Sequence, residues 1–417
     1  MKNLFIYAFL FVIIAFNAYS QTLMEQRKAS EYEMRLKKAT EICNSPDAIK
    51  YFDFLINDID QSAISKYCMG SFYYSEKLYQ KAIANYYEAK TFEAEFYETY
   101  RGLGDSSVKL KDFDSALSYY GADDVVKDKE DDEYWALKIL DKIIGSNDYA
   151  SYTLEKRKKI MDEKFYVLYQ IADIYRLGKG ASDSAATYYI KILDEIDRSL
   201  YSEPEQKEKF APVYNNLGIS LSNQNFVGYG GQLYEQALGL SSDNATYNHY
   251  TGMYYYNKGE YDKALPYLNK AIFLDRDYFS SYDVRGSLYF ERGLYDLAID
   301  DFTSAINIGG DNNDYNGDNN TDVARMYKLR SDCYIPKGVD ESDSDKAKEY
   351  LDNAVADLLK AAELDKTNND YKDLCNSAVT IRCEKLYNNG NARVYDEGEV
   401  YGRDSDELCK NPCPKSK

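Results

Sequence analysis

Large and small apolar residues recur along this chain with a fixed period of 34 residues, as at Gly218, Gly252 and Gly286. In residues 279–310, small residues occupy positions 8, 20 and 27, and aromatic residues occupy positions 4, 11, 17 and 24. Runs spaced three or four residues apart predict two amphipathic helices. Gly293, between the two runs, is expected to end the first helix in the left-handed conformation. A period of this length predicts a solenoid, in which each repeat buries its apolar face against its neighbour.

Copies of the pattern predict nine repeats over most of residues 29–364. They begin at Ala29, Ala63, Tyr97, Asp131, Phe165, Ala211, Ala245, Phe279 and about Ala324. The fourth repeat departs from the pattern, because Lys138 and Arg157 occupy positions where the other repeats have small residues. A shift of 12 residues in the register between Ala172 and Gly218 predicts an insertion there.

The pattern resembles the tetratricopeptide repeat, which has small residues at positions 8, 20 and 27 and bulky ones at 4, 7, 11, 17 and 24. The resemblance implies an all-α, right-handed superhelical solenoid of about nine helix–turn–helix repeats with a C-terminal capping helix. The expected layout is a signal peptide (1–20), repeats 1–5 (29–199), an insertion (200–210), repeats 6–8 (211–310), a divergent repeat 9 with insertions (311–364), a capping helix (365–388) and a cysteine-containing tail (389–417).

In this family, positions 2, 5, 9, 12 and 13 of each first helix line a concave groove that holds a partner. Carried over repeat by repeat, these positions give a groove rich in aromatic and amide side chains, with the chain's single tryptophan among them. The expected groove residues are Tyr67, Tyr74, Arg101, Trp135, Tyr169, Arg176, Asn215, His249, Tyr256 and Phe290. The family's carboxylate clamp needs Lys at position 5 and Asn at position 9, and no repeat here has that pair.

Composition narrows the class of partner. Acidic residues exceed basic ones by 19, and no basic stripe is visible, which argues against binding to nucleic acid. Tyrosine is common, with 45 residues, and most of these rings are expected to pack between helices with the hydroxyl at a wet edge.

Candidate catalytic chemistry is sparse. His249 is the only histidine, so a nucleophile–base pair has one possible base. Three glycine-containing segments, at 102–104, 178–180 and 228–231, lack the GK[ST] ending of a phosphate loop. We therefore expect no enzyme activity and no cofactor.

Two metal sites can be considered. Oxygen-bearing residues alternate from Asp314 to Asp322 as in a calcium loop, but Asn319 and Arg325 replace the expected glycine and glutamate, which favours a solvated insertion. A zinc site in the C-terminal tail lacks both CxxC spacing and a nearby histidine. No metal is expected.

The first twenty residues carry Lys2 before an apolar run and small residues at Ala18–Ser20, which predicts a secretory signal peptide similar to those of Bacteroidetes-type envelope proteins. The mature chain is then expected in the periplasm or outside the cell, without a membrane span.

The chain has seven cysteines, so at least one is free or pairs with another chain. A Cys43–Cys68 bridge is not expected, because these residues would lie ~13 Å apart along neighbouring helices. Cys409 and Cys413 in the tail could instead reach back to Cys375 and Cys383.

These observations favour an exported scaffold or adaptor that binds a peptide or protein partner of the cell envelope in its groove. The alternative is a carbohydrate-binding protein that resembles SusD-like nutrient-binding proteins, because aromatic and amide side chains also suit sugar rings. A hydrolase acting on envelope polymers is disfavoured by the missing catalytic groups.

Overall fold

The computed structural model describes residues 63–92, 97–126, 135–311 and 319–387, and two short strands at 393–395 and 399–401. The expected signal peptide, the first repeat, most of the Asp314–Asp322 loop and most of the tail lie outside these residues. The chain divides into two compact units. The N-terminal unit extends to Lys209 and includes 219–226, and the C-terminal unit comprises 210–218 and the residues from Val227 onward.

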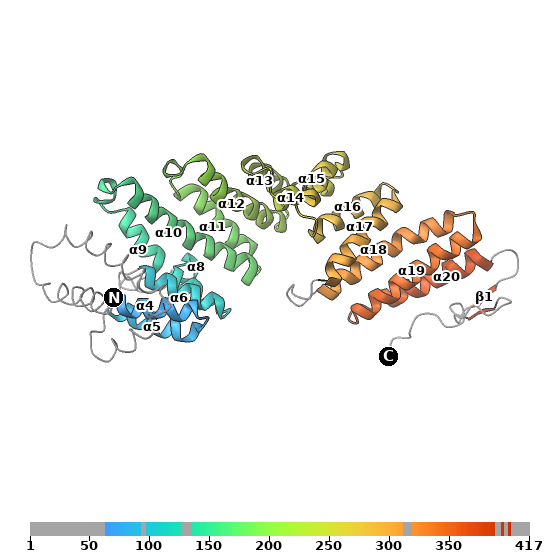
Figure 1. Ribbon diagram of the computed structural model, residues 1–417, viewed down its shortest axis with the longest axis horizontal. Helices are drawn as coiled ribbons and strands as arrows, with labels where there is room; N and C mark the ends of the chain where they lie inside the picture. Colours follow the sequence, from blue (N-terminus) through green and yellow to red (C-terminus); the bar gives the residue numbers. More distant parts are fainter. Residues whose placement is uncertain are drawn as a thin grey trace, which may run out of the picture. The chain divides into compact units, whose positions relative to one another are not determined.

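Helices of the N-terminal unit pack mainly against their neighbours in sequence (Figure 1). They are α4 (Ala63–Ser75), α5 (Tyr79–Phe92), α6 (Tyr97–Lys109), α7 (Phe113–Tyr120), α8 (Asp123–Val126), α9 (Ala136–Ile144), the 3-10 turn η1 (Tyr149–Ser151), α10 (Leu154–Asp173), the π-helical turn η2 (Ile174–Gly178), α11 (Ser182–Glu195) and the 3-10 turn η3 (Arg198–Leu200). Helix α12 (Glu203–Asn223) contributes residues to both units.

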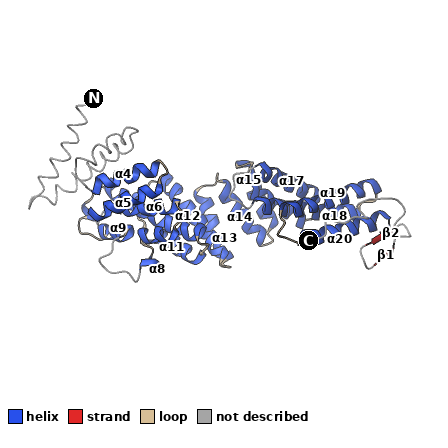
Figure 2. Cartoon of the chain, turned by 90° about the horizontal axis from the view of Figure 1, so that it is seen from below, coloured by secondary structure: helices blue, strands red, loops and turns tan. Residues whose placement is uncertain are grey.

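The C-terminal unit continues the same arrangement of paired helices. Its helices are α13 (Val227–Leu240), α14 (Ala245–Asn257), α15 (Tyr261–Leu274), α16 (Phe279–Glu291), α17 (Tyr295–Asp311), α18 (Asn319–Asp340), α19 (Ser344–Leu364) and α20 (Asp370–Tyr387). Helix α20 packs on α19, as expected for a closing helix. The strands β1 (Arg393–Tyr395) and β2 (Glu399–Tyr401) pair antiparallel, with Val394 opposite Val400, in a short hairpin that the sequence did not predict (Figure 2).

Four expected repeat starts, Ala63, Tyr97, Ala245 and Phe279, coincide with the first residues of α4, α6, α14 and α16. In the turn between paired helices, the residue at position 15 of the repeat has a positive φ. Gly259 (φ 73°) and Gly293 (φ 69°) occupy it in two repeats, as expected for Gly293. Other repeats have non-glycine residues there: Lys77 (φ 61°), Lys111 (φ 60°) and Asn225 (φ 67°).

The glycine at repeat position 8 allows the two helices of a pair to approach closely. A Cβ added at Gly70 would lie 2.6 Å from the ring of Tyr86, sixteen residues later. The same relation links Gly218 with Tyr234 at 2.6 Å, and Gly286 with Phe302 at 2.8 Å. The ring of each second helix therefore fills the space left by the missing side chain of the first helix. This explains the period seen in the sequence.

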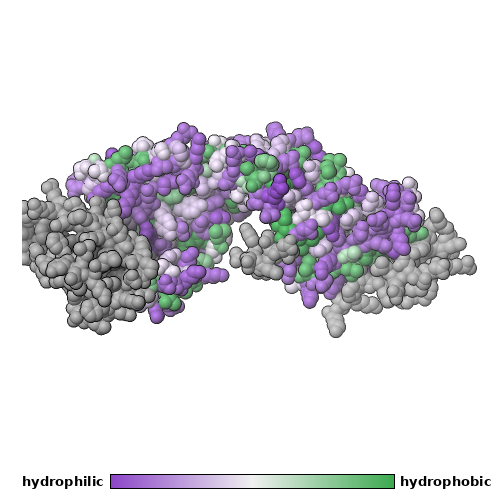
Figure 3. Space-filling view, in the orientation of Figure 1, coloured by the Kyte–Doolittle hydropathy of each residue, from purple (hydrophilic) through white to green (hydrophobic). Residues whose placement is uncertain are grey.

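Small apolar clusters follow one another along each unit. Ala82, Tyr86 and Leu103 form one in the N-terminal unit, and Ala264, Leu268 and Leu288 form another in the C-terminal unit. On the face shown in Figure 3, the described residues are largely hydrophilic, with apolar residues in small separate groups.

The expected register is wrong across the fourth and fifth repeats. A first helix was expected from Asp131 and another from Phe165, but a nine-residue α9 is followed by a new helix that begins at Leu154. Lys138 and Arg157 are too large for the close-contact positions that the period gave them. The hydroxyl of Thr153 also accepts a hydrogen bond from the amide of Lys156, which starts α10 as an N-cap. Helix α10 then pairs with α11.

The segment 200–210, expected as an insertion, is mostly helical. Helix α12 begins at Glu203, eight residues before the expected repeat start at Ala211. Ser202 and Glu205 form a capping box at its N-terminus.

Cys68, Cys375 and Cys383 each take part in a disulfide, whereas Cys333 is free and buried. Cys43, Cys409 and Cys413 lie outside the described residues. The expected absence of a Cys43–Cys68 bridge and the expected links from the tail to Cys375 and Cys383 therefore stay predictions.

Candidate functional site

Three expected groove residues of the N-terminal unit lie close together on one surface of its first helices. Tyr67 and Tyr74 come from α4, and Arg101 comes from α6. The structure adds residues from α6 and α10 that the sequence argument did not select. We call this surface the tyrosine-rich face, and define it by Tyr67, Tyr74, Arg101, Asp105, Glu163 and Tyr166.

Polar contacts hold the centre of the tyrosine-rich face in one arrangement. Arg101 Nη1 lies 2.5 Å from Glu163 Oε2, and its guanidinium lies 5.6 Å from the centre of the Tyr166 ring. Asp105 Oδ1 accepts hydrogen bonds from the hydroxyls of Tyr120 at 2.5 Å and Tyr166 at 3.0 Å. These contacts join α6 to α10 and fix the orientation of the charged groups.

Burial and neighbouring charges together shift the pKa values of the side chains on this face. Burial raises the pKa of Asp105, and the hydrogen bond from Tyr120 and the charge of Arg101 act in the opposite direction. Burial alone would lower the pKa of Arg101, but Glu163 raises it, so the guanidinium stays charged. Burial also raises the pKa of Tyr67 and Tyr74, which therefore stay protonated. The face offers phenol hydroxyls, one guanidinium and two carboxyl groups.

Tyr166 is the most accessible ring of the face, with 37% of its surface exposed. Tyr67 packs against Tyr86 with ring centres 5.6 Å apart, and Tyr74 packs against Tyr79 at 5.5 Å. The sequence did contain a signal for the missed residues, because Asp105 and Tyr166 occupy positions 9 and 2 of the expected repeats. Glu163 carried no such signal, because the expected register put it at position 33, at the end of the fourth repeat.

Tyr169 and Arg176, two further expected groove residues, are engaged within their own helix pair. The ring of Tyr169 stacks on Phe165 with centres 5.8 Å apart. Arg176 Nε donates to the hydroxyl of Tyr189 at 3.1 Å, and its Nη2 pairs with Asp173 at 2.9 Å. These two residues stabilise the end of α10 and its π-helical turn.

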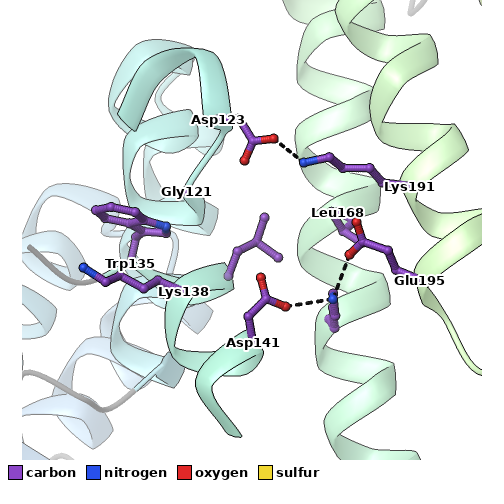
Figure 4. Close-up of a pocket in the computed structure, with 10 residues that line it drawn as sticks. Gly121, Asp123, Trp135, Lys138, Asp141, Leu168, Lys191 and Glu195 are labelled. Atoms are coloured by element: carbon purple, nitrogen blue, oxygen red, sulfur yellow. Dashed lines mark hydrogen bonds and ion pairs between the residues drawn. The ribbon is translucent and has the colours of Figure 1, made fainter. Parts of the chain in front are cut away.

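Trp135 lies apart from the tyrosine-rich face, in a pocket between α9 and the pair α10–α11 (Figure 4). The pocket has a cavity volume of about 280 Å³. Gly121, with φ 91°, ends α7 beside the indole, and a side chain at this position would collide with it. Lys138 Nζ lies 4.8 Å from the centre of the indole ring. The residues that line the pocket are Gly121, Asp123, Trp135, Leu137, Lys138, Asp141, Lys164, Leu168, Lys191 and Glu195.

Lysine–carboxylate pairs form the polar wall of this pocket. Lys164 Nζ lies 2.7 Å from both Asp141 Oδ1 and Glu195 Oε2, and Lys191 pairs with Asp123. Burial alone would lower the pKa of Lys164, but the hydrogen bonds that it donates to its two carboxylate partners raise it. The Lys164 ammonium therefore stays charged at neutral pH.

Asn215 and His249 are buried between helices of the C-terminal unit, with 3% and 4% of their surfaces exposed. They could contact a partner only after a rearrangement. His249 Nδ1 lies 3.1 Å from Ser281 Oγ, but Ser281 is fully buried. Burial lowers the pKa of His249 to about 4. This serine–histidine contact has no access for a substrate, and we interpret it as part of the packing.

Tyr256 and Phe290 are half-buried at the C-terminal ends of α14 and α16. Tyr256 contacts Tyr261 with ring centres 5.8 Å apart, and Phe290 contacts Tyr295 at the same distance. Both rings therefore close the turn of their own helix pair, and only part of each remains available to a partner.

Among the residues that the structure describes, no three histidine, cysteine, aspartate or glutamate side chains are grouped as metal ligands would be. Residues 314–318, the first part of the calcium-like loop, lie outside them. None of the described helices combines the length and the apolar character that crossing a bilayer requires.

One stretch of the chain matches a known protein family. Residues 251–278, which cover most of α14 and all of α15, match the tetratricopeptide repeat family. No curated protein matches the sequence.

Similar solved structures include one described as MamA MSR-1 C2, which is 20% identical over 50% of this chain and 97% of its own, with a TM-score of 0.35. A second, YrrB, is described as a TPR protein with an unusual peptide-binding site. It is 16% identical over 56% of this chain and 97% of its own, with a TM-score of 0.39. The assignment of the fold depends on the helix pairs and on the family match. Residues 251–278 thus match a tetratricopeptide repeat, and the helix pairs before and after them have the same helix–turn–helix arrangement.

Proposed function

We propose that this chain is a scaffold that binds a peptide or protein partner on the tyrosine-rich face of its N-terminal unit. The observation that carries the proposal is the fixed network of Arg101, Glu163, Asp105 and Tyr166 beside an exposed ring. Aromatic and arginine side chains are the usual anchors of protein interfaces. A pre-formed network also lowers the entropy cost of binding.

Repeat architecture supports this role over catalysis. Stacked helix pairs provide an extended surface, and the single serine–histidine contact is buried. The peptide-binding site named for YrrB belongs to that protein, and it gives one example of such binding in a repeat protein.

We also propose that the protein is exported. The pattern of residues 1–20 is typical of a secretory signal, and the disulfides at Cys68, Cys375 and Cys383 suit an oxidising compartment. Cell fractionation with mass measurement of the purified N-terminus tests this proposal. A cytosolic protein that retains residues 1–20 would contradict it.

The binding proposal is tested with a double variant, Tyr74→Ala with Tyr166→Ala, in affinity capture from envelope extract. Tyr87→Ala is the matched control, because Tyr87 is 52% exposed on the second helix α5 of the same unit. We expect one partner to be captured by the parent and the control, and lost from the double variant. Equal capture by all three proteins would contradict the proposal.

A second candidate is carbohydrate binding. It is favoured by the pocket beside Trp135, where an indole ring adjoins carboxylate and ammonium groups that can hydrogen-bond to sugar hydroxyls. A glycan array with the parent protein and Trp135→Ala tests it, and the candidate requires binding that the variant loses.

A further inference from the structure

We propose that the pocket beside Trp135 binds a lysine or arginine side chain of the partner. This inference deepens the proposed function, because it names the chemistry that a second contact point in the same unit would recognise. The pocket is separate from the tyrosine-rich face and can be tested alone.

The pocket is small. The cavity volume of about 280 Å³ lies near the lower limit of small-molecule sites, roughly 300 Å³. One long side chain fits such a space better than an oligosaccharide. Leu137 and Leu168 line it and can cover the apolar stem of a lysine or arginine.

The charged groups in the polar wall of the pocket differ in accessibility. The carboxylates are the exposed members of the pairs, with side-chain exposures of 67% for Asp123, 55% for Asp141 and 39% for Glu195. The lysines are less accessible, at 9% for Lys164 and 28% for Lys191. A ligand that enters the pocket therefore reaches the carboxylates of these pairs more easily than their lysines.

The carboxylates of the polar wall also keep acceptor atoms for a ligand. Among the described side chains, Asp141 and Glu195 each use one oxygen for Lys164, and Asp123 uses one for Lys191. Each carboxylate has a second oxygen that can accept a hydrogen bond from an incoming ammonium or guanidinium. Figure 4 shows these three groups facing one another across the pocket, with Trp135 and Lys138 at its other end.

The indole provides a further contact for a cation. Trp135 already has the Lys138 ammonium over its ring at 4.8 Å, which shows that its face can hold a cation. The net charge of −19 also steers a basic partner toward the chain.

Because Trp135 is the chain's single tryptophan, its fluorescence reports this pocket directly. The probes are short capped peptides, Gly-Lys-Gly and Gly-Arg-Gly, with Gly-norleucine-Gly and Gly-Glu-Gly as matched controls. We expect a saturable change in emission with the two basic peptides only, and a weaker affinity at high salt.

Variants of the charged pocket residues then test whether the carboxylates attract the basic side chain. Asp123→Asn and Asp141→Asn should each weaken binding of the basic peptides by about fivefold, as expected for a surface charge pair. Lys138→Gln removes a neighbouring cation, so it should strengthen binding. Asp243→Asn is the control, because Asp243 is an exposed carboxylate of the C-terminal unit that pairs with Lys270. Circular dichroism verifies that each variant is folded.

Several results would overturn the inference. One is saturation by Gly-Glu-Gly or by a panel of monosaccharides, with no saturation by the basic peptides. Others are unchanged affinity in the two carboxylate variants, weaker binding in Lys138→Gln, or no saturable response to any basic peptide. Loss of the partner in affinity capture would leave this titration unaffected, so failure of the inference and failure of the proposed function are distinguishable.

Discussion

At the scale of single residues, the glycine at repeat position 8 is required by the ring that packs against it. The ring of Phe302 would be 2.8 Å from a Cβ at Gly286, and Gly70 and Gly218 have the same relation to Tyr86 and Tyr234. In the sequence, this requirement appears as a glycine that recurs with the repeat period. The structure shows why larger residues are excluded.

We expect Gly286→Ala to lower the free energy of unfolding by about 1–3 kcal/mol, because the new methyl group overpacks the contact with Phe302. Urea unfolding measures the change. Gly239→Ala is the matched control, because Gly239 is also in a helix but has nothing within 4 Å of the added methyl. The control should gain up to about 1 kcal/mol from helix propensity. Equal effects in both variants would contradict the close-approach argument.

Glu98 is a second residue with a measurable effect, in this case on how stability depends on pH. It is buried, and burial raises its pKa to about 7, with Tyr97, Glu163 and Arg101 as its charged or polar neighbours. Its carboxyl group holds a proton in the folded state up to about pH 7, whereas the unfolded chain loses it near its ordinary pKa of 4.5. The free energy of unfolding should therefore fall as pH rises from 4.5 to 7.

Glu98→Gln removes this ionisation. At pH 8 we expect the variant to be about 2 kcal/mol more stable than the parent, because the parent must ionise a buried carboxyl group. At pH 4.5 the two proteins should have similar stability. Thermal unfolding at both pH values is the measurement, and a difference that does not change with pH would refute the explanation.

At the scale of elements, the turn between paired helices keeps a left-handed residue at position 15 of the repeat. Lys77 and Lys111 adopt φ values near 60°, which non-glycine residues rarely do. These two positions therefore carry backbone strain that Gly259 and Gly293 avoid.

Lys111→Gly should stabilise the protein by about 1 kcal/mol, because glycine adopts this conformation without a steric cost. Lys109→Gly is the control, since Lys109 is the last residue of α6 and glycine is unfavourable in a helix. Chemical unfolding compares the two. Destabilisation by both substitutions would show that the turn is not strained.

The periodic pattern predicted the helix pairs well where the small residues are present. Helices α4, α6, α14 and α16 begin at the expected residues because close helix contact requires glycine or alanine at fixed offsets. The pattern failed around α9 and α10. There Lys138 occupies a close-contact position, and a local signal, the capping residue Thr153, sets where the helix begins.

At the scale of the whole molecule, covalent bonds supplement the packing of neighbouring repeats. Repeat proteins gain stability mainly from adjacent helix pairs, and the disulfides at Cys68, Cys375 and Cys383 add covalent restraints to this packing. Cys333 lies buried without a disulfide.

Alkylation with iodoacetamide in denaturant tests this arrangement. Without reductant we expect modification at Cys333, and at Cys68, Cys375 and Cys383 only after reduction. Peptide mass spectrometry identifies the modified residues. Modification of Cys375 or Cys383 before reduction, in protein purified from an oxidising compartment, would be inconsistent with the structure.

The candidate site was only partly predictable from the sequence. Family positions identified Tyr67, Tyr74 and Arg101. They did not identify Glu163, the ion-pair partner of Arg101, because that contact depends on where α10 begins. Asn215 and His249 occupy the same family position and are nevertheless buried. Position in a repeat therefore predicts the side of the helix, while neighbouring helices decide whether the side chain is accessible.

The most direct test of the account is site-specific photo-crosslinking in the cell envelope. A benzoylphenylalanine is placed at Tyr166 on the tyrosine-rich face, and separately at Tyr87 on α5 as the control. We predict one discrete crosslinked protein from position 166 and none from position 87. The same products from both positions, or a product from position 87 alone, would contradict the central claim that this face binds the partner.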